Sequence, residues 1–218
     1  MSKIALIAGA TGLVGGHLLS ILLESSDYDK VKVLTRRPLN QSAEKLIEIT
    51  VSGVAELDTQ KDNLKADDVF CCLGTTMKKA GSKEAFREID YNYPLSLARL
   101  SIEMGAKHFL LISAMGANPQ SGIFYNKVKG EVEEAIHKVG FESFTIMRPS
   151  LIMGDRNEKR TGENIGKFVM GAFKFLLIGP LKKYRAVEAK KIAKAMAVLA
   201  KKADPGMRVV ESNEIQNY

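Results

Sequence analysis

Short apolar runs alternate with longer amphipathic segments along most of the chain. The first apolar run, Lys3–Ala8, has the length of a strand and lacks helical periodicity, which predicts a buried strand. Later runs of the same kind predict five more strands in the order of the chain and a short final one. These runs are Val31–Leu34, Leu46–Val51, Val69–Leu73, His108–Ile112, Ser143–Met147 and Met207–Val210.

The segments between these runs have the apolar spacing of helices that bury one face. Helices are predicted from about Leu13 to Glu24, from about Lys83 to Met104 with Gly105 as a C-cap, over Gly122–Val139, and over Val187–Lys202. Strands that alternate with helices imply a parallel sheet covered on both faces. We therefore predict a doubly wound α/β fold in a single domain spanning residues 1–218, with a small substrate or cover region around residues 150–185.

Composition agrees with one globular domain, because 45% of the 218 residues are hydrophobic and 26% are charged. The apolar start at Ile4–Ala8 is too short for a signal peptide. The longest apolar stretch, Phe168–Leu181, is interrupted by Lys174, so no integral membrane segment is expected. Cys71 and Cys72 are adjacent and would point to opposite faces of a strand. They are typical of reduced core residues, which predicts a cytoplasmic protein.

The positive charge is concentrated near the carboxyl end of the chain. Residues 1–150 hold 18 Lys and Arg and 18 Asp and Glu, whereas residues 151–218 hold 14 and 7, so the net +7 comes from the last third. Solvated helix faces explain this pattern, and so does a basic surface that meets an anionic substrate, membrane or protein partner. Nucleic acid is not expected as a partner, because the lysine pairs are scattered and no nucleic-acid-binding motif accompanies them.

A glycine-rich turn joins the first predicted strand to the first predicted helix. It reads Gly9-Ala10-Thr11-Gly12-Leu13-Val14-Gly15. In such a turn, Gly9 permits the tight bend, Gly12 lets the backbone approach a pyrophosphate, and Gly15 lets the helix pack close to the strand. The phosphates would meet free N–H groups at the helix N-terminus. The alternative is a structural turn without a ligand, but the position after the first strand favours a Rossmann-type dinucleotide site.

The end of the second strand indicates which dinucleotide binds. An NAD site requires an acidic residue about 20 positions after the glycine turn, whereas this strand ends Thr35-Arg36-Arg37. A guanidinium binds a 2′-phosphate through two hydrogen bonds and keeps its charge at all relevant pH values. Arg36 and Arg37 therefore favour NADP(H), the alternative being two exposed loop arginines.

Three residues are candidates for catalysis. Tyr125 and Lys129 are four apart on a predicted helix and so share a face, and Ser113 ends the preceding strand. A nearby ammonium would lower the pKa of the phenol, so that Tyr125 can exchange a proton with a carbonyl or alcohol oxygen. Ser113 would hold the same oxygen. Tyr28 and Lys32 form a second pair with this spacing, but that pair runs into the second strand and is expected to be incidental.

The sequence resembles atypical short-chain dehydrogenases/reductases, and within them the HIV Tat-interacting oxidoreductase-like branch. The resemblance covers about residues 3–163. It rests on the glycine turn, Thr35–Arg37, Cys71–Thr76, Lys107–Phe109, Tyr125, Val128–Glu133, Arg148-Pro149, Asp155-Arg156 and Arg160. It implies that NADPH is bound by the candidates Gly9, Thr11, Gly12, Leu13, Val14, Arg36, Arg37, Leu73, Gly74, Thr75, Tyr125, Lys129, Ile152 and Arg160. No metal site is implied.

One position departs from the pattern of many relatives. An asparagine that braces the active site in those proteins corresponds to Asp90 here, and Asn92 lies two residues on, on a different face. Two functions therefore remain. The first is NADPH-dependent hydride transfer to a carbonyl compound or sugar-like small molecule, and the second is a non-catalytic NADPH-binding regulatory or scaffold protein. We also expect Ile165–Leu181 to cover the substrate side of the nicotinamide, unless it is a plain packing helix.

Overall fold

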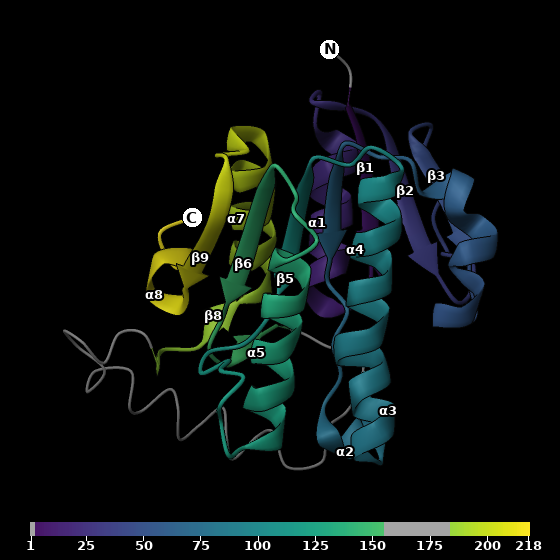
Figure 1. Ribbon diagram of the computed structural model, residues 1–218. Coiled ribbons are helices and arrows are strands. Elements are labelled where there is room, and N and C mark those ends of the chain that lie inside the picture. The colour runs from purple at the N-terminus through teal and green to yellow at the C-terminus, as the bar shows by residue number, and fades with distance from the viewer. Residues whose placement is uncertain (1–2, 155–183) are drawn as a thin grey trace.

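A single parallel sheet organises the molecule. The computed structural model describes residues 3–154 and 184–218, and within them seven strands pair in the order β3-β2-β1-β4-β5-β6-β9 (Figure 1). Every neighbouring pair is parallel. The strands are β1 Lys3–Ala8, β2 Tyr28–Thr35, β3 Leu46–Thr50, β4 Asp68–Cys71, β5 His108–Ile112, β6 Ser143–Arg148 and β9 Gly206–Glu211. All seven strands predicted from the apolar runs are confirmed, as is the doubly wound Rossmann-type fold.

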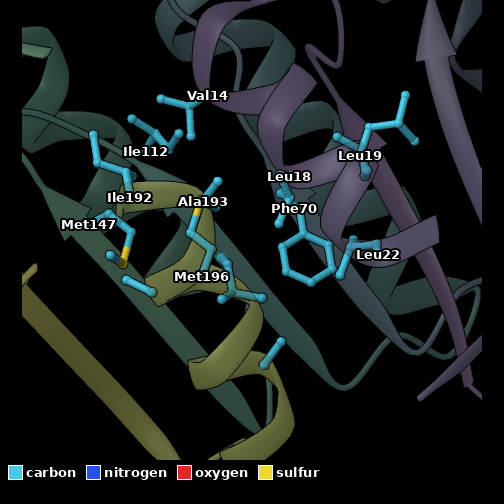
Figure 2. Packing of buried hydrophobic residues seen from close by; sticks show 14 of the residues in the cluster. Val14, Leu18, Leu19, Leu22, Phe70, Ile112, Met147, Ile192, Ala193 and Met196 are labelled. Carbon is cyan, nitrogen blue, oxygen red and sulfur yellow. The ribbon is translucent and has the colours of Figure 1, made fainter. Parts of the chain in front are cut away.

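Helices cover both faces of this sheet. Helices α1 (Leu13–Glu24) and α7 (Ala189–Lys202) lie on one face, and α4 (Tyr93–Glu103) and α5 (Phe124–His137) lie on the other. On the first face, Leu18 of α1 and Met196 of α7 pack with Phe70 of β4 (Figure 2). The next residue of β4, Cys71, belongs to the cluster on the opposite face. Both sides of the strands are thus buried, which explains why the strands read as continuous apolar runs rather than as alternating ones.

The strand order determines where a ligand can lie. The chain runs outward from β1 to β2 and β3, and then returns to place β4 on the other side of β1. In open parallel sheets, the crevice beyond the carboxyl ends of the strands at this reversal is the usual ligand site. The glycine turn follows β1, and the segment Leu73–Thr75 follows β4, so both lie at this edge.

The long helix predicted before β5 is present but contains an irregularity. Helix α3 (Lys83–Arg87) passes into a π-helical turn (Glu88–Asn92) and then into α4, which ends just before Gly105. A π-helical turn inside an α-helix adds a residue to one turn, and such insertions are frequent at functional sites. Here Asp90 lies on the turn and is buried.

The sequence placed the start of the last long helix two residues too early. Val187–Glu188 form the short strand β8, which pairs with β7 (Ile152–Met153), and α7 begins only at Ala189. This pairing joins residues about 35 positions apart, so local periodicity carries no signal for it. Four other short elements were also not predicted. They are the helices α2 (Met77–Ala80) and α8 (Ser212–Ile215), and the 3₁₀ turns over Val54–Glu56 and Asp58–Leu64.

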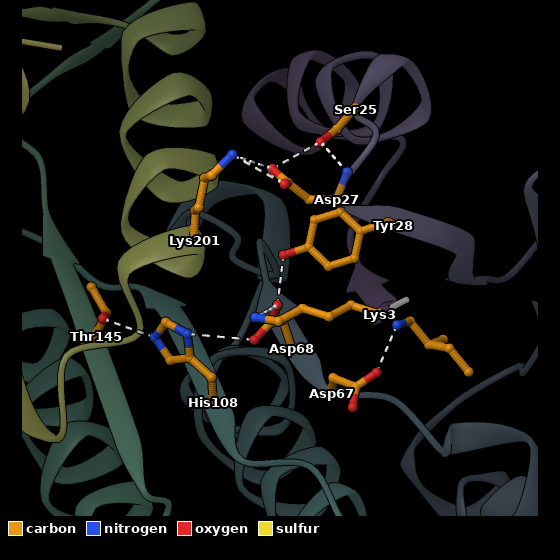
Figure 3. A network of polar contacts seen from close by, with 10 residues as sticks. Lys3, Ser25, Asp27, Tyr28, Asp67, Asp68, His108, Thr145 and Lys201 are labelled. Carbon is orange, nitrogen blue, oxygen red and sulfur yellow. Dashed lines mark hydrogen bonds and ion pairs between the residues drawn. The ribbon is translucent and has the colours of Figure 1, made fainter. Parts of the chain in front are cut away.

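A buried polar network lies at the amino ends of the strands, opposite the glycine turn (Figure 3). The Asp68 carboxylate accepts a hydrogen bond from the Tyr28 hydroxyl at 2.6 Å and one from Lys3 Nζ at 3.1 Å, and His108 Nδ1 is 3.6 Å away. Burial by itself raises the pKa of Asp68, but the contacts with His108, Tyr28 and Lys3 together hold it below its ordinary value. Tyr28 therefore has a structural partner at the amino ends of the strands, far from the carboxyl ends where the glycine turn lies.

Replacing Tyr28 by phenylalanine is expected to lower the free energy of unfolding at neutral pH by about 1–3 kcal/mol, because Asp68 loses a buried hydrogen-bond donor. The lowered pKa of Asp68 stabilises the fold above the unfolded-state value near 4, and that contribution disappears as the pH falls through the folded-state value. The loss caused by Tyr28→Phe should therefore shrink in acid. Urea denaturation over a series of pH values measures this.

Asp29→Asn is the matched control, because Asp29 is exposed next to Tyr28. This control should leave both the stability and its pH dependence nearly unchanged. A Tyr28→Phe protein as stable as the unaltered chain at neutral pH would show that the contact with Asp68 contributes little.

Candidate active site

The glycine turn has the geometry of a nucleotide-binding turn. Gly9 has a φ of +89°, and a Cβ there would lie 2.8 Å from the Cys72 carbonyl carbon. A Cβ at Gly15 would lie 2.1 Å from the Gly9 carbonyl oxygen, so both positions require glycine. Gly12 is the N-cap of α1, no side chain of the described residues caps the helix, and no acidic residue lies in its first turn. The Gly12 N–H donates to the Gly9 carbonyl oxygen at 3.0 Å, and the N–H groups in the first turn of α1 remain available to an anion.

The remaining candidates of the turn divide into exposed and packed residues. Thr11 is exposed, whereas Val14 is buried in the core on the α1 face of the sheet. Leu13 is half-buried, and its side chain lies against the backbone of Gly154. Ile152 is also half-buried and packs against the same core. The structure thus brings the segment after β6 to the helix of the glycine turn.

The arginine pair lies at the carboxyl end of β2. Thr35 Oγ1 donates to the Arg37 carbonyl oxygen at 2.5 Å, which bends the chain directly after the strand. Both arginine side chains are exposed. The positive charge of Arg36 lowers the pKa of the Tyr93 phenol. Burial has the larger effect and raises that pKa to about 12. Arg36 therefore lies at the same edge of the sheet as the glycine turn.

The loop after β4 connects the turn to the catalytic candidates. Leu73 follows Cys72, whose backbone touches Gly9. A Cβ at Gly74 would lie 3.5 Å from Asp90 Oδ1 and 3.8 Å from Lys129 Nζ. The backbone N–H of Thr75 donates to Asp90 Oδ2 at 2.9 Å. The loop thus extends without a gap from the glycine turn to the buried end of Lys129.

Lys129 is buried, with its ammonium at the carboxyl end of β5. Its Nζ lies 2.7 Å from Asp90 Oδ1 and donates to the Ile112 carbonyl oxygen at 3.5 Å. Ser113 follows Ile112, is buried, and donates its backbone N–H to the Met147 carbonyl oxygen at 2.8 Å. The Ser113 hydroxyl has no hydrogen-bond partner among the described residues. A buried polar group of this kind is rare unless a ligand or water completes it.

Tyr125 lies one helical turn before Lys129 in α5. Its ring packs on Phe86 with the centroids 5.4 Å apart. The pKa predicted for Tyr125 from the sequence is wrong in direction. Burial raises the pKa of the phenol, Lys129 lowers it by less, and Asp90 raises it further. The sequence pattern contains Lys129, but it does not contain the burial of Tyr125 or the carboxylate that partners the lysine.

Asp90 is the residue of this site that sequence analysis did not assign. Its position was identified only as a departure from an expected asparagine. The buried carboxylate contacts both Lys129 and the backbone of Thr75. The signal that was available was an acidic residue inside an amphipathic helix, seven positions after Lys83 where the helix starts. Arg160, the pair Asp155-Arg156 and the proposed cover over Ile165–Leu181 lie outside the described residues.

The comparisons with known proteins assign this arrangement to a family. Residues 9–173 match the family described as NAD(P)H-binding. The chain belongs to the NAD(P)H-binding family. Relatives include the protein HTATIP2 of Rattus norvegicus, 36% identical over 174 residues that cover 78% of this chain and 72% of the relative. A protein named fmp52, mitochondrial, from Emericella nidulans is 34% identical over 179 residues, covering 79% and 76%. The atypical short-chain dehydrogenase/reductase assignment, with its HIV Tat-interacting branch, is thereby confirmed.

Solved structures confirm the fold of this NAD(P)H-binding protein. The enzyme WbmH of Bordetella bronchiseptica, in complex with NAD+, superposes with a TM-score of 0.72 at 16% identity, covering 97% of this chain and 76% of that one. MoeE5, in complex with UDP-glucose and NAD, gives a TM-score of 0.71 at 19% identity, covering 97% and 79%. At these identities the likeness concerns the fold alone.

The comparisons also correct the predicted location. Several relatives named fmp52 are mitochondrial proteins, which contradicts the cytoplasmic assignment. The two cysteines are free, as predicted, but unpaired thiols distinguish a reducing compartment from an oxidising one and do not separate the cytosol from an organelle. In the part of the chain that the structure describes, no helix is long and apolar enough to cross a bilayer. The same residues contain no cluster of three or more His, Cys, Asp or Glu suited to a metal ion.

Proposed function

We propose that this protein is an NADP(H)-dependent oxidoreductase that transfers hydride to a carbonyl small molecule. The observation that carries the proposal is a continuous path of contacts at one edge of the sheet. It runs from Gly9 through Cys72 to Gly74, and from there through Lys129 to Ile112 and Ser113. Residues suited to hold a dinucleotide and residues suited to move a proton are therefore adjacent.

The residues present fit a dinucleotide. Gly9 and Gly15 keep the turn narrow, and the uncapped N-terminus of α1 offers N–H groups to a pyrophosphate. Leu73–Thr75 and Ile152 would flank the bound molecule, and Arg36 and Arg37 would hold its 2′-phosphate. When bound, the nicotinamide supplies or accepts the hydride.

The proton chemistry belongs to the chain itself. The raised pKa of Tyr125 keeps the phenol protonated at neutral pH, which is the form that a proton donor in carbonyl reduction requires. Ser113, with its unpaired hydroxyl, would donate a hydrogen bond to the carbonyl oxygen and orient it towards Tyr125. The ammonium of Lys129 would stabilise the phenolate that remains after proton transfer and would hold the ribose. Substrate-dependent oxidation of NADPH by the purified protein is the direct test.

A second candidate function is NADPH binding without turnover. It is favoured by the ion pair between Lys129 and Asp90, which occupies the lysine, and by the burial that makes Tyr125 a weaker acid. The two functions share the cofactor and differ in whether any carbonyl compound is reduced.

The proposal predicts a strong preference for NADPH over NADH, because Arg36 forms a charge-assisted contact with the 2′-phosphate. Such a contact contributes about 1.5–3 kcal/mol, or about tenfold to a hundredfold in affinity. Calorimetric titration with both cofactors should show this preference in the unaltered protein and its loss in Arg36→Ala. Equal affinities of the unaltered protein for NADPH and NADH would refute the assigned role.

A further inference from the structure

Two ionisable side chains from two helical segments meet at the buried end of the active site, and a third acts on them one helical turn away. Tyr125 and Lys129 come from α5, and Asp90 comes from the π-helical turn before α4. The Lys129 ammonium lies 2.7 Å from one carboxylate oxygen of Asp90, and the other oxygen accepts the N–H of Thr75 at 2.9 Å. The side chains of Lys129 and Asp90 are 4% and 0% exposed, so this contact is almost fully removed from water.

We propose that Asp90 is a positioning residue that ties Lys129 to the Leu73–Thr75 loop and cancels most of the positive charge that Tyr125 would otherwise experience. A carboxylate in direct contact with the ammonium forms a neutral pair. The electrostatic effect of a neutral pair on a third group is much weaker than that of an isolated charge, above all in a buried site of low dielectric constant. Asp90 thus both locates the lysine and limits its influence on the phenol.

The other described charged groups near Tyr125 do not take over this effect on the pKa of its phenol. On α3, Arg87 forms an ion pair with Glu131, and Lys83 lies over the ring of Phe124. On β4, burial raises the pKa of the Cys71 thiol to about 12, which keeps the thiol neutral. Among the residues that the structure describes, Lys129 and Asp90 are the charges that act on the phenol of Tyr125. Lys129 lowers the pKa of that phenol and Asp90 raises it.

If the proposed function holds, this arrangement of charges also affects turnover. A phenol next to a neutralised lysine keeps its proton to higher pH but is a weaker acid, so Asp90 would keep Tyr125 in the donor form while slowing the proton transfer itself. The charge relation between Asp90, Lys129 and Tyr125 can be measured without any substrate or cofactor. Failure of the inference is therefore distinguishable from failure of the proposed function.

The test is a titration of the tyrosine ring carbons by NMR in protein labelled with ¹³C at tyrosine Cζ, with Tyr125→Phe used to assign the resonance. In the unaltered protein, Tyr125 is expected to ionise above the ordinary tyrosine value of about 10. Asp90→Asn keeps the shape of the side chain and one acceptor oxygen, which can serve Thr75 or Lys129 but not both, and it removes the negative charge. Its Tyr125 resonance should titrate about 1–3 pH units lower, as expected when a phenol faces an uncompensated ammonium.

Glu88→Gln is the matched control, because Glu88 is an exposed carboxylate on the same π-helical turn. It should leave the Tyr125 midpoint unchanged. An Asp90→Asn midpoint equal to or above that of the unaltered protein would overturn the proposal. If Asp90→Asn does not fold, the unaltered protein still decides: a Tyr125 midpoint below about 10 would show that Lys129 is not neutralised.

Discussion

Tyr125→Phe is expected to reduce the rate of NADPH-dependent carbonyl reduction by about 10²–10⁴-fold, the usual contribution of a general acid. The substitution removes only the hydroxyl and keeps the ring that packs on Phe86. The fold and the affinity for NADPH should therefore be retained. Steady-state kinetics combined with calorimetric titration of the same preparation measures both quantities.

Tyr28→Phe is the control for this experiment, because Tyr28 has the same spacing to a lysine but begins β2 at the opposite edge of the sheet. It should leave the rate and NADPH affinity of the folded protein unchanged, even though it lowers stability. Near-normal turnover by Tyr125→Phe would contradict the assignment of Tyr125 as the proton donor.

Lys129→Ala is expected to have effects on stability, binding and rate together. It leaves the buried Asp90 carboxylate without its partner, and breaking a buried ion pair costs about 3–5 kcal/mol. It also removes the group assigned to the ribose and to the phenolate of Tyr125. Chemical denaturation, NADPH titration and kinetics should all show a loss.

Lys127→Ala provides the comparison, because Lys127 is exposed on the same helix two residues earlier. All three measurements should be nearly unaffected in this variant. A Lys129→Ala protein with the stability and NADPH affinity of Lys127→Ala would mean that the ion pair with Asp90 has no net energetic role.

Most of the fold was predictable because its determinants are local. Buried parallel strands produce uninterrupted apolar runs, and the helices that cover them produce one apolar face. The glycine turn was predictable for a related reason: Gly9 and Gly15 lie where a Cβ would collide with neighbouring backbone. Elements without such local signals were missed. The pairing of β7 with β8 depends on residues distant in sequence, and α2 and α8 are only one turn long.

The candidate site was likewise only partly predictable from the sequence. The sequence showed the types and spacing of Tyr125, Lys129 and Ser113. It did not show which charged groups surround them in the fold. The pKa of Tyr125 depends on how deeply the ring is buried and on Asp90, which is 35 residues away in sequence. The basic last third gives a further example. Lys201 forms an ion pair with Asp27, and Lys191 donates to the Gln216 carbonyl oxygen, so these two charges have partners within the fold. An anionic or protein partner for the remaining lysines stays a prediction.

We propose that this NAD(P)H-binding protein reduces a carbonyl compound. The most direct measurement incubates the purified protein with NADPH and a panel of aldehydes, ketones and sugar-like carbonyl compounds, and follows the absorbance of the reduced nicotinamide. We predict oxidation of NADPH that depends on at least one of these compounds and that Tyr125→Phe largely abolishes. Tight binding of NADPH without oxidation by any compound of the panel would contradict the claim and favour a non-catalytic, NADPH-bound protein.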